Sequence, residues 1–129
     1  MVNGYQILCV EDSVNVQQML AFILKKAGYT PHIANNGREA IAMTDDLKPD
    51  LILMDIMMPD LAGIRAIELI KAKVENKDIP ILVLSAYNDP KLIQQALDAG
   101  AVKYLEKTIV PEELVRMIET YLPQESVKE

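Results

Sequence analysis

The sequence predicts an α/β fold in which five short strands alternate with five helices, and the strands form one parallel sheet covered by helices on both faces. Short apolar runs alternate with longer segments whose apolar residues recur every three or four positions, a pattern typical of β-α crossover units. Glycine, proline and short polar residues stand at several of the expected junctions, where they favour turns and helix ends. The 129 residues contain no repeat or flexible linker, so we expect one domain over residues 1–123 and a polar tail over 124–129.

The first two units differ in how clearly they are marked. Residues 5–10, which contain the apolar run Ile7-Leu8-Cys9-Val10, predict a fully buried strand, and the helix after it should end at Gly28. The predicted buried face of this helix consists of Val16, Met19, Leu20, Ile23, Leu24 and Ala27. Residues 30–34 form a weaker strand, and the turn at Asn36-Gly37 leads into a short helix that carries Ala40, Ile41 and Met43.

The third and fourth strands are short and strongly apolar. Residues 51–54 form the third strand, which ends at Asp55, and the loop after it contains Pro59 and Gly63. The apolar face of the following helix consists of Ile64, Ile67, Ile70 and Val74. The fourth strand is expected at residues 79–84.

The last two helices have recognisable first turns. Asp89-Pro90 provides a capping carboxylate followed by proline at the first helical position. Leu92, Ile93, Ala96 and Leu97 then lead to Gly100, and the fifth strand follows at residues 101–105. The fifth helix has proline and two acids in its first turn, where carboxylates face the positive end of the helix dipole. These residues are Pro111, Glu112 and Glu113, and the apolar face consists of Leu114, Val115, Ile118 and Leu122.

Composition limits the classes of partner. The net charge of −6 opposes the phosphate contacts on which nucleic-acid binding relies, so we expect no direct binding of nucleic acid or of an anionic membrane. No apolar stretch reaches the ~20 residues that a membrane helix needs, and the first residues do not resemble a signal peptide. We therefore expect a cytoplasmic protein with protein partners. Cys9 lies in an apolar run and should be a buried, inert thiol.

Charged and polar residues stand where four of the predicted strands end. Glu11 and Asp12 follow the first strand, Asp55 the third, Ser85 the fourth and Lys107 the fifth. The carboxyl ends of parallel strands meet at one edge of a sheet, so three carboxylates should lie close together with few cations. Such a cluster repels itself unless it holds a metal, and oxygen ligands with room for water and phosphate suit Mg²⁺. A metal, a carboxylate nucleophile, a hydroxyl and a lysine suffice for phosphoryl transfer, with either Asp12 or Asp55 as the acceptor.

Several motifs, in order, resemble the receiver domain of two-component response regulators over residues 5–121. They are Val10-Glu11-Asp12-Ser13, Leu53-Met54-Asp55-Ile56-Met57-Met58-Pro59-Asp60 with Gly63, Leu84-Ser85-Ala86, Gly100-Ala101 and Tyr104-Leu105-Glu106-Lys107. The separations of Ser85 and Lys107 from Asp55 are also similar to those in the single-domain chemotaxis regulator. The resemblance implies a flavodoxin-like sheet with strand order 2-1-3-4-5, the order known for flavodoxin and for that regulator.

The resemblance also implies a role for each site residue. Asp55 would be the phosphoacceptor, Ser85 and Lys107 would bind phosphoryl oxygens, and Tyr104 would be the switch aromatic that responds to Ser85. The implied ligands of Mg²⁺, or of Mn²⁺, are Asp12 and Asp55 directly, Glu11 through water, and the backbone carbonyl of Met57. The domain would act as a signalling switch rather than as an enzyme on other substrates, although it would catalyse its own phosphorylation and dephosphorylation.

The partners follow from the same resemblance. A histidine kinase or a histidine phosphotransfer protein would donate the phosphoryl group. The face formed by the fourth helix, the fifth strand and the fifth helix would bind a downstream protein, and it could also support a phosphorylation-dependent homodimer.

Three positions depart from the commonest family pattern. Thr108 stands where most members have a proline, often in the cis form, and a cis bond before threonine would cost about 3 to 4 kcal/mol. We therefore expect a trans bond and a repositioned loop after the fifth strand. Met57 replaces a frequently polar residue and could shield the acyl phosphate from water. Glu11 replaces the commoner aspartate, and its longer side chain should still reach a metal-bound water.

Three other functions fit less well. A flavodoxin-like FMN site needs a phosphate-binding loop after the first strand, where Glu11 and Asp12 would repel the phosphate. An aspartate-nucleophile phosphohydrolase typically has a second acid two residues after the nucleophile, where Met57 stands. A degenerate, phosphate-independent module is disfavoured by the complete set of Glu11, Asp12, Asp55, Ser85 and Lys107.

Overall fold

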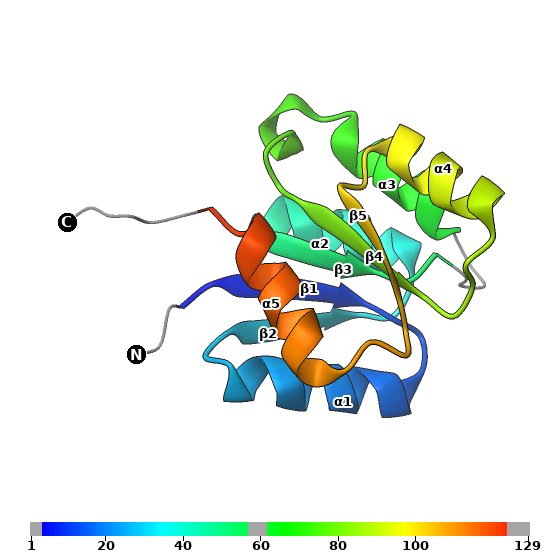
Figure 1. Ribbon diagram of the computed structural model, residues 1–129. Coiled ribbons are helices and arrows are strands. Elements are labelled where there is room, and N and C mark those ends of the chain that lie inside the picture. Colours follow the sequence, from blue (N-terminus) through cyan, green and yellow to red (C-terminus); the bar gives the residue numbers. More distant parts are fainter. Residues whose placement is uncertain (1–3, 57–61, 124–129) are drawn as a thin grey trace.

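The structure is a computed structural model that describes residues 4–56 and 62–123. A five-stranded parallel sheet lies between two layers of helices, and its strand order is β2-β1-β3-β4-β5 (Figure 1). The strands are β1 (Gln6–Val10), β2 (Thr30–Ala34), β3 (Leu51–Met54), β4 (Ile81–Ser85) and β5 (Lys103–Glu106). The α/β class and the strand order implied by the family resemblance are confirmed.

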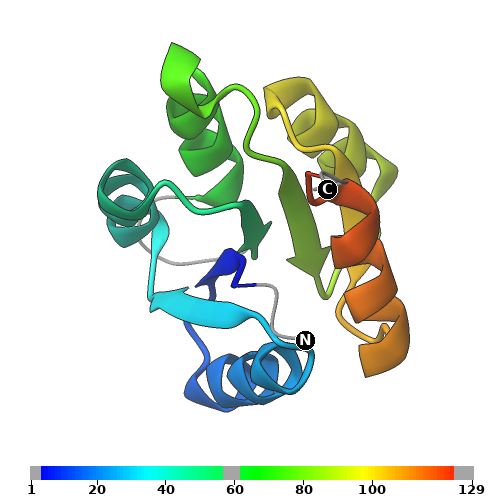
Figure 2. The ribbon, with the colours of Figure 1, turned by 90° about the vertical axis from the view of Figure 1, so that its left-hand side faces the viewer.

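The helices cover both faces of the sheet, as predicted (Figure 2). One face carries α1 (Val14–Lys26) and α5 (Pro111–Tyr121), and the other carries α2 (Gly37–Leu47), α3 (Gly63–Lys71) and α4 (Pro90–Ala99). A short 3-10 helix, η1 (Val74–Asn76), follows α3. Among the described residues, no helix combines the length and the apolar character needed to cross a membrane.

The pleat of the strands divides the core into two halves. In β1, Ile7 and Cys9 are fully buried beneath α1 and α5, whereas Leu8 and Val10 are buried beneath the helices of the other face. Neighbouring side chains of a strand point to opposite faces, so a strand covered on both faces is apolar at every position. Burial raises the pKa of the Cys9 thiol to about 12, and the nearby Glu11 charge adds to this effect. The expectation of a buried, inert cysteine is therefore confirmed.

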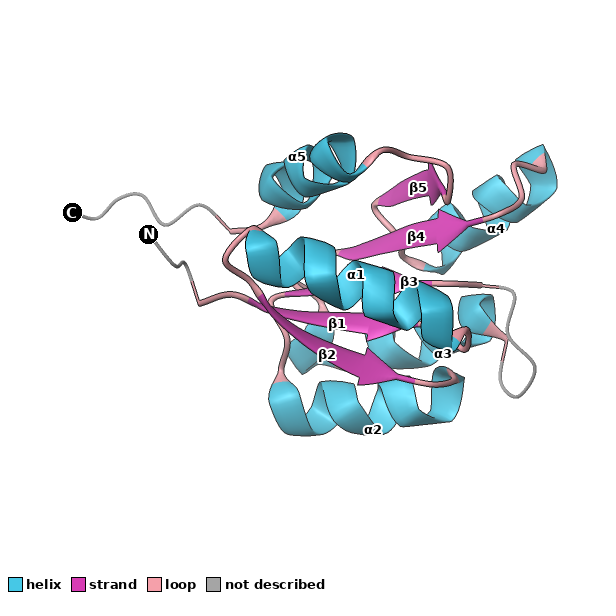
Figure 3. Ribbon diagram, turned by 90° about the horizontal axis from the view of Figure 1, so that it is seen from below, coloured by secondary structure: helices cyan, strands magenta, loops and turns pink. Residues whose placement is uncertain are grey.

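Polar residues fix three helix starts at the edge where the strands end (Figure 3). The Ser13 hydroxyl accepts a hydrogen bond from the Val16 amide, and the side chains of Asn36 and Asp89 accept bonds from amides in the first turns of α2 and α4. These acceptors satisfy amides that have no partner within the helix. The predicted start of α4 at Asp89-Pro90 is thereby confirmed.

Some predicted boundaries and faces are wrong. β4 and β5 begin at Ile81 and Lys103, two residues later than predicted. Val74 does not extend the face of α3, because the helix ends at Lys71, and Val74 is 75% exposed in η1. Met19 and Leu97 are also exposed, because the apolar stripes of α1 and α4 are wider than the surface that their neighbours cover.

The turn after α3 folds back onto the helix end. The Lys71 ammonium group donates to the carbonyls of Asn76, Lys77 and Ile79, and the Asn76 side-chain amide donates to the Ile70 carbonyl. Gly100 packs directly against Lys71, since a Cβ atom placed on Gly100 would lie 2.8 Å from Lys71 Cγ. This cluster lies at the edge of the sheet where β4 and β5 begin.

Candidate functional site

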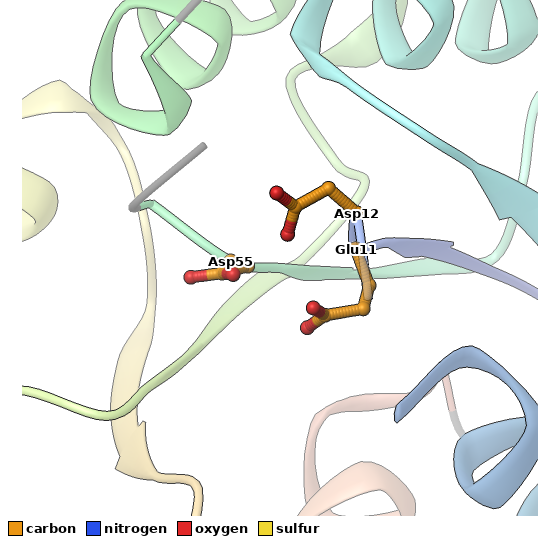
Figure 4. A group of neighbouring side chains, drawn as sticks. All are labelled: Glu11, Asp12 and Asp55. Atoms are coloured by element: carbon orange, nitrogen blue, oxygen red, sulfur yellow. The ribbon is translucent and has the colours of Figure 1, made fainter. Parts of the chain in front are cut away.

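Three carboxylates meet at the edge where the strands end (Figure 4). Glu11 and Asp12 follow β1 and Asp55 follows β3, and one oxygen from each lies within 4.8 Å of the other two. Glu11 and Asp55 are 2% and 5% exposed, whereas Asp12 is exposed. The predicted convergence of the three acids is confirmed.

Lys107 is the cation that faces this cluster. Its Nζ atom lies 2.9 Å from Glu11 Oε1 and 3.2 Å from Asp55 Oδ2. Burial alone would lower the pKa of Lys107, but the hydrogen bond to Glu11 and the negative charges of Asp55 and Glu11 outweigh it, so the pKa is raised. Lys107 is therefore held in its charged form beside two carboxylates.

Backbone hydrogen bonds continue the sheet into the site. The Glu11 amide donates to the Ala34 carbonyl and the Asp55 amide donates to the Val10 carbonyl, each at 3.0 Å. These bonds extend the strand pairing one residue beyond β1 and β3. Both acids thus start from rigid backbone, which fixes the direction of their side chains.

Gln17 and Gly63 support the two acids, and neither was assigned a role from the sequence. The Gln17 side-chain amide donates to the Glu11 carbonyl at 2.7 Å, one turn into α1. A Cβ atom on Gly63 would lie 2.5 Å from the Asp55 carbonyl oxygen, so only glycine lets α3 start this close to the acid. Gly63 stands in the family motif, whereas no pattern in the sequence marks Gln17.

Ser85 and Tyr104 are joined through the backbone of Tyr87. The Ser85 hydroxyl is fully buried and accepts a hydrogen bond from the Tyr87 amide at 3.1 Å. The Tyr104 hydroxyl donates to the Tyr87 carbonyl at 2.7 Å. Ser85 and Tyr104, which have predicted switch roles, therefore bind the amide and the carbonyl of one residue between β4 and α4. That residue, Tyr87, was not identified from the sequence.

The last site predictions concern the loops that follow β5 and β3. The Lys107-Thr108 peptide bond is trans, as predicted. The Lys107 amide donates to the Ser85 carbonyl at 2.8 Å, which ties the start of the following loop to β4. Met57, whose carbonyl was expected to bind the metal, lies outside the described residues.

The side chains present fit a hard divalent cation. Three carboxylates face one ammonium group, which leaves an excess of negative charge. Within residues 4–56 and 62–123, no hydrogen bond or ion pair engages the Asp12 side chain. Exposed carboxylate oxygens beside buried ones suit Mg²⁺, which keeps several waters while binding one or two carboxylates.

Comparisons with known proteins agree with this geometry. The profile of the response regulator receiver domain matches residues 7–119. The phosphate regulon transcriptional regulatory protein PhoB of Pseudomonas aeruginosa is 38% identical over 119 residues, which are 92% of this chain and 52% of that protein. The regulatory protein AtoC of Escherichia coli is 34% identical over 123 residues, which are 95% of this chain and 26% of that protein. The chain thus spans about half the length of one relative and about a quarter of the other.

Solved structures give the same result. Chemotaxis protein CheY4 of Vibrio cholerae superposes with a TM-score of 0.88 at 31% identity, covering 92% of this chain and 99% of that one. A putative response regulator from Chloroflexus aurantiacus superposes with a TM-score of 0.89 at 30% identity, covering 95% and 100% of the two chains. The chain therefore belongs to the receiver domain family of two-component response regulators, signalling domains whose known function is a switch based on aspartate phosphorylation.

Proposed function

We propose that the chain accepts a phosphoryl group on Asp55 and, in response, changes a protein-binding face formed by α4, β5 and α5. The observation that carries this proposal is the bridge made by Lys107 between Asp55 and Glu11, beside Asp12. It also favours Asp55 over Asp12 as the acceptor, because within the described residues Lys107 contacts Asp55 and forms no ion pair with Asp12. A lysine at the acceptor can neutralise charge on the incoming phosphoryl oxygens.

The reaction is a transfer between two nucleophiles. A carboxylate oxygen of Asp55 forms a bond to phosphorus, while the phosphorus–nitrogen bond of a phosphohistidine donor breaks. The bonding electron pair leaves with the imidazole nitrogen, and the product on this chain is an acyl phosphate. The donor would be a histidine kinase or a histidine phosphotransfer protein, and the chain catalyses the step by positioning its own residues.

A divalent cation completes the site. Asp12 and Asp55 would hold Mg²⁺ or Mn²⁺ directly and Glu11 through water, with the Met57 carbonyl as a further ligand. The cation supplies positive charge that offsets the repulsion between carboxylate and phosphoryl oxygens. Lys107 supplies the remaining positive charge from the chain itself.

The contacts of Ser85 support a switch. A hydroxyl that accepts a bond from the Tyr87 amide still has its own proton to donate, and a phosphoryl oxygen on Asp55 would accept it. A displacement of Ser85 toward that oxygen would move Tyr87, whose carbonyl is held by Tyr104. Tyr104 lies on β5, so the displacement reaches the proposed output face.

The character of that face favours a protein partner. Tyr87, Leu97, Val102 and Val110 lie on or beside α4, β5 and α5, and each is at least 39% exposed. Exposed apolar side chains with polar surroundings suit protein contacts, and the net charge of −6 disfavours nucleic acid. The partner is a downstream protein or, after phosphorylation, a second copy of the chain.

The test is phosphate uptake from acetyl phosphate with Mg²⁺, measured by intact-protein mass and by release of the phosphoryl group with hydroxylamine, which cleaves acyl phosphates. Wild type should gain one phosphoryl group and Asp55→Asn none. Asp50→Asn is the matched control, because Asp50 stands just before β3 and Asp55 just after it, and it should behave as wild type. Equal uptake by Asp55→Asn and wild type would refute the assignment of the acceptor.

A further inference from the structure

An apolar groove with a volume of about 620 Å³ lies between α1 and α5. These two helices cover the face of the sheet opposite α2, α3 and α4 (Figure 2). Met19 and Phe22 on the groove are 49% and 67% exposed, so apolar surface of α1 remains open to solvent. The apolar residues that line the groove are Met19, Phe22, Ile23, Ala27, Pro111 and Val115. Of the three elements of the proposed output face, the groove involves only α5.

The two walls of the groove carry opposite charges. Lys26 stands in the last turn of α1 and Glu112 in the first turn of α5, and both line the groove. The Lys26 Nζ atom lies 6.0 Å from the centre of the Phe22 ring. Within residues 4–56 and 62–123, neither Lys26 nor Glu112 forms an ion pair. Each of these charges can therefore pair with an opposite charge on a partner without breaking an ion pair of the described chain.

These features make the groove complementary to itself. In a dimer with two-fold symmetry, every contact between two different residues occurs twice, once in each direction. When the α1 wall of one copy lies over the α5 wall of the other, Lys26 meets Glu112 twice, and Phe22 of each copy enters the apolar groove of the other. A different protein would need an apolar anchor and both charges in the same arrangement, whereas a second copy has them already.

We propose that two copies of the unphosphorylated chain associate through this groove, with Phe22 as the apolar anchor and reciprocal Lys26–Glu112 ion pairs that fix the orientation. The association goes beyond the proposed function and does not depend on phosphorylation of Asp55. The net charge of −6 on each copy opposes the association, so the dimer is weak, with a Kd on the order of 10 to 100 μM.

The first test is sedimentation equilibrium of the full chain without a phosphodonor. Phe22→Asp should weaken the association at least about 30-fold, because it places a charge at the desolvated centre of the interface. Val74→Asp is the matched control, since Val74 is 75% exposed in η1 and does not line the groove, and its Kd should stay within about twofold of wild type. A wild-type chain that is monomeric up to about 1 mM, or a dimer that Phe22→Asp leaves intact, would overturn the proposal.

The second test reverses the charges one at a time. Lys26→Glu and Glu112→Lys each place like charges opposite one another twice in the dimer, so each should weaken the association at least about tenfold. Lys25→Glu changes the net charge as Lys26→Glu does, but Lys25 does not line the groove, and its Kd should stay within about twofold of wild type. An equal loss in Lys25→Glu would show that net charge, and not the proposed ion pair, determines the association.

The decisive measurement mixes the two charge-reversed variants. Lys26→Glu and Glu112→Lys together restore opposite charges at both pairs, so their equimolar mixture should associate within about threefold of the wild-type Kd. This recovery also requires that both variants are folded, which circular dichroism checks separately. Folded variants that remain monomeric when mixed would rule out the reciprocal arrangement. None of these measurements involves phosphoryl transfer, so a wrong acceptor assignment would leave their result unchanged.

Discussion

Two lysines lie at opposite edges of the same sheet, one where the strands end and one where they begin, in opposite electrostatic surroundings. Lys107 faces the carboxylates of Glu11 and Asp55 where the strands end, and its pKa is raised. Lys71 faces the backbone carbonyls of Asn76, Lys77 and Ile79 where β4 begins, and burial lowers its pKa. Full negative charges stabilise an ammonium group more than carbonyl dipoles do. The carboxylate edge thus keeps a charged lysine beside the site proposed for phosphoryl transfer. At the other edge, a lysine stabilises a turn through its hydrogen bonds to backbone carbonyls.

The largest expected effect comes from removing the lysine of the charged edge. Lys107→Met should slow phosphorylation of Asp55 about 100-fold, because one preorganised charge at the phosphoryl oxygens is lost. The measurement is the single-turnover rate with acetyl phosphate and Mg²⁺. The fold should survive, as judged by circular dichroism. An unchanged rate would contradict a role of Lys107 in phosphoryl transfer.

Removing the lysine of the other edge should affect stability instead. Lys71→Met should lower the free energy of unfolding by about 1 to 3 kcal/mol, because partly buried carbonyls lose their donor. Urea denaturation measures this value. Phosphorylation at saturating Mg²⁺ should stay within about twofold of wild type, and a loss comparable to that of Lys107→Met would contradict the division between the two edges.

A smaller effect is expected at the glycine that packs on Lys71. Gly100→Ala should cost about 1 to 2 kcal/mol of stability, because Gly100 has a φ of 126° that alanine rarely adopts. The added Cβ atom would also press on Lys71 Cγ. Lys71→Met keeps the Cγ atom but frees the side chain from the carbonyl contacts that hold it in place, so it can move away from the added Cβ atom. The double variant should then lose less stability than the two single losses combined, and strict additivity would show that the two residues are not coupled.

The smallest effect is a difference in pH dependence in metal-free solution, measured as the stability of wild type relative to each lysine variant. The folded pKa of Lys71 is below the unfolded value of 10.5, so the unfolded chain holds more protons just below that pH and stability rises with pH there. The folded pKa of Lys107 is above 10.5, so its stabilisation is complete below that value and is lost as pH rises through the folded pKa. Urea denaturation between about pH 9 and about pH 11 should show the two opposite slopes, and slopes of the same sign would contradict the assigned surroundings.

Part of the fold and of the site could be predicted from the sequence. The five β-α units and the meeting of Glu11, Asp12 and Asp55 follow from apolar periodicity and from the parallel direction of the strands, which are properties of the chain taken element by element. Either acid could be the acceptor on that basis, and only the family spacing singled out Asp55. The trans bond before Thr108 followed from the general cost of a cis bond.

Contacts between elements could not be predicted in the same way. The end of α3 depends on how Lys71 and Asn76 fold back on it, and the exposure of Met19 depends on where α5 lies beside α1. Gln17 binds the backbone carbonyl of Glu11, and Tyr87 is bound through its own backbone carbonyl by Tyr104. Such bonds leave no periodic or compositional trace.

The link through Tyr87 has an evolutionary consequence. Both hydroxyls bind main-chain atoms of Tyr87, and this residue is 52% exposed. Because any residue except proline supplies the same amide and carbonyl, the side chain at this position can diverge without breaking the connection between Ser85 and Tyr104. A duplicated gene could therefore acquire a new partner through changes at this surface position while it keeps both hydrogen bonds of the proposed switch.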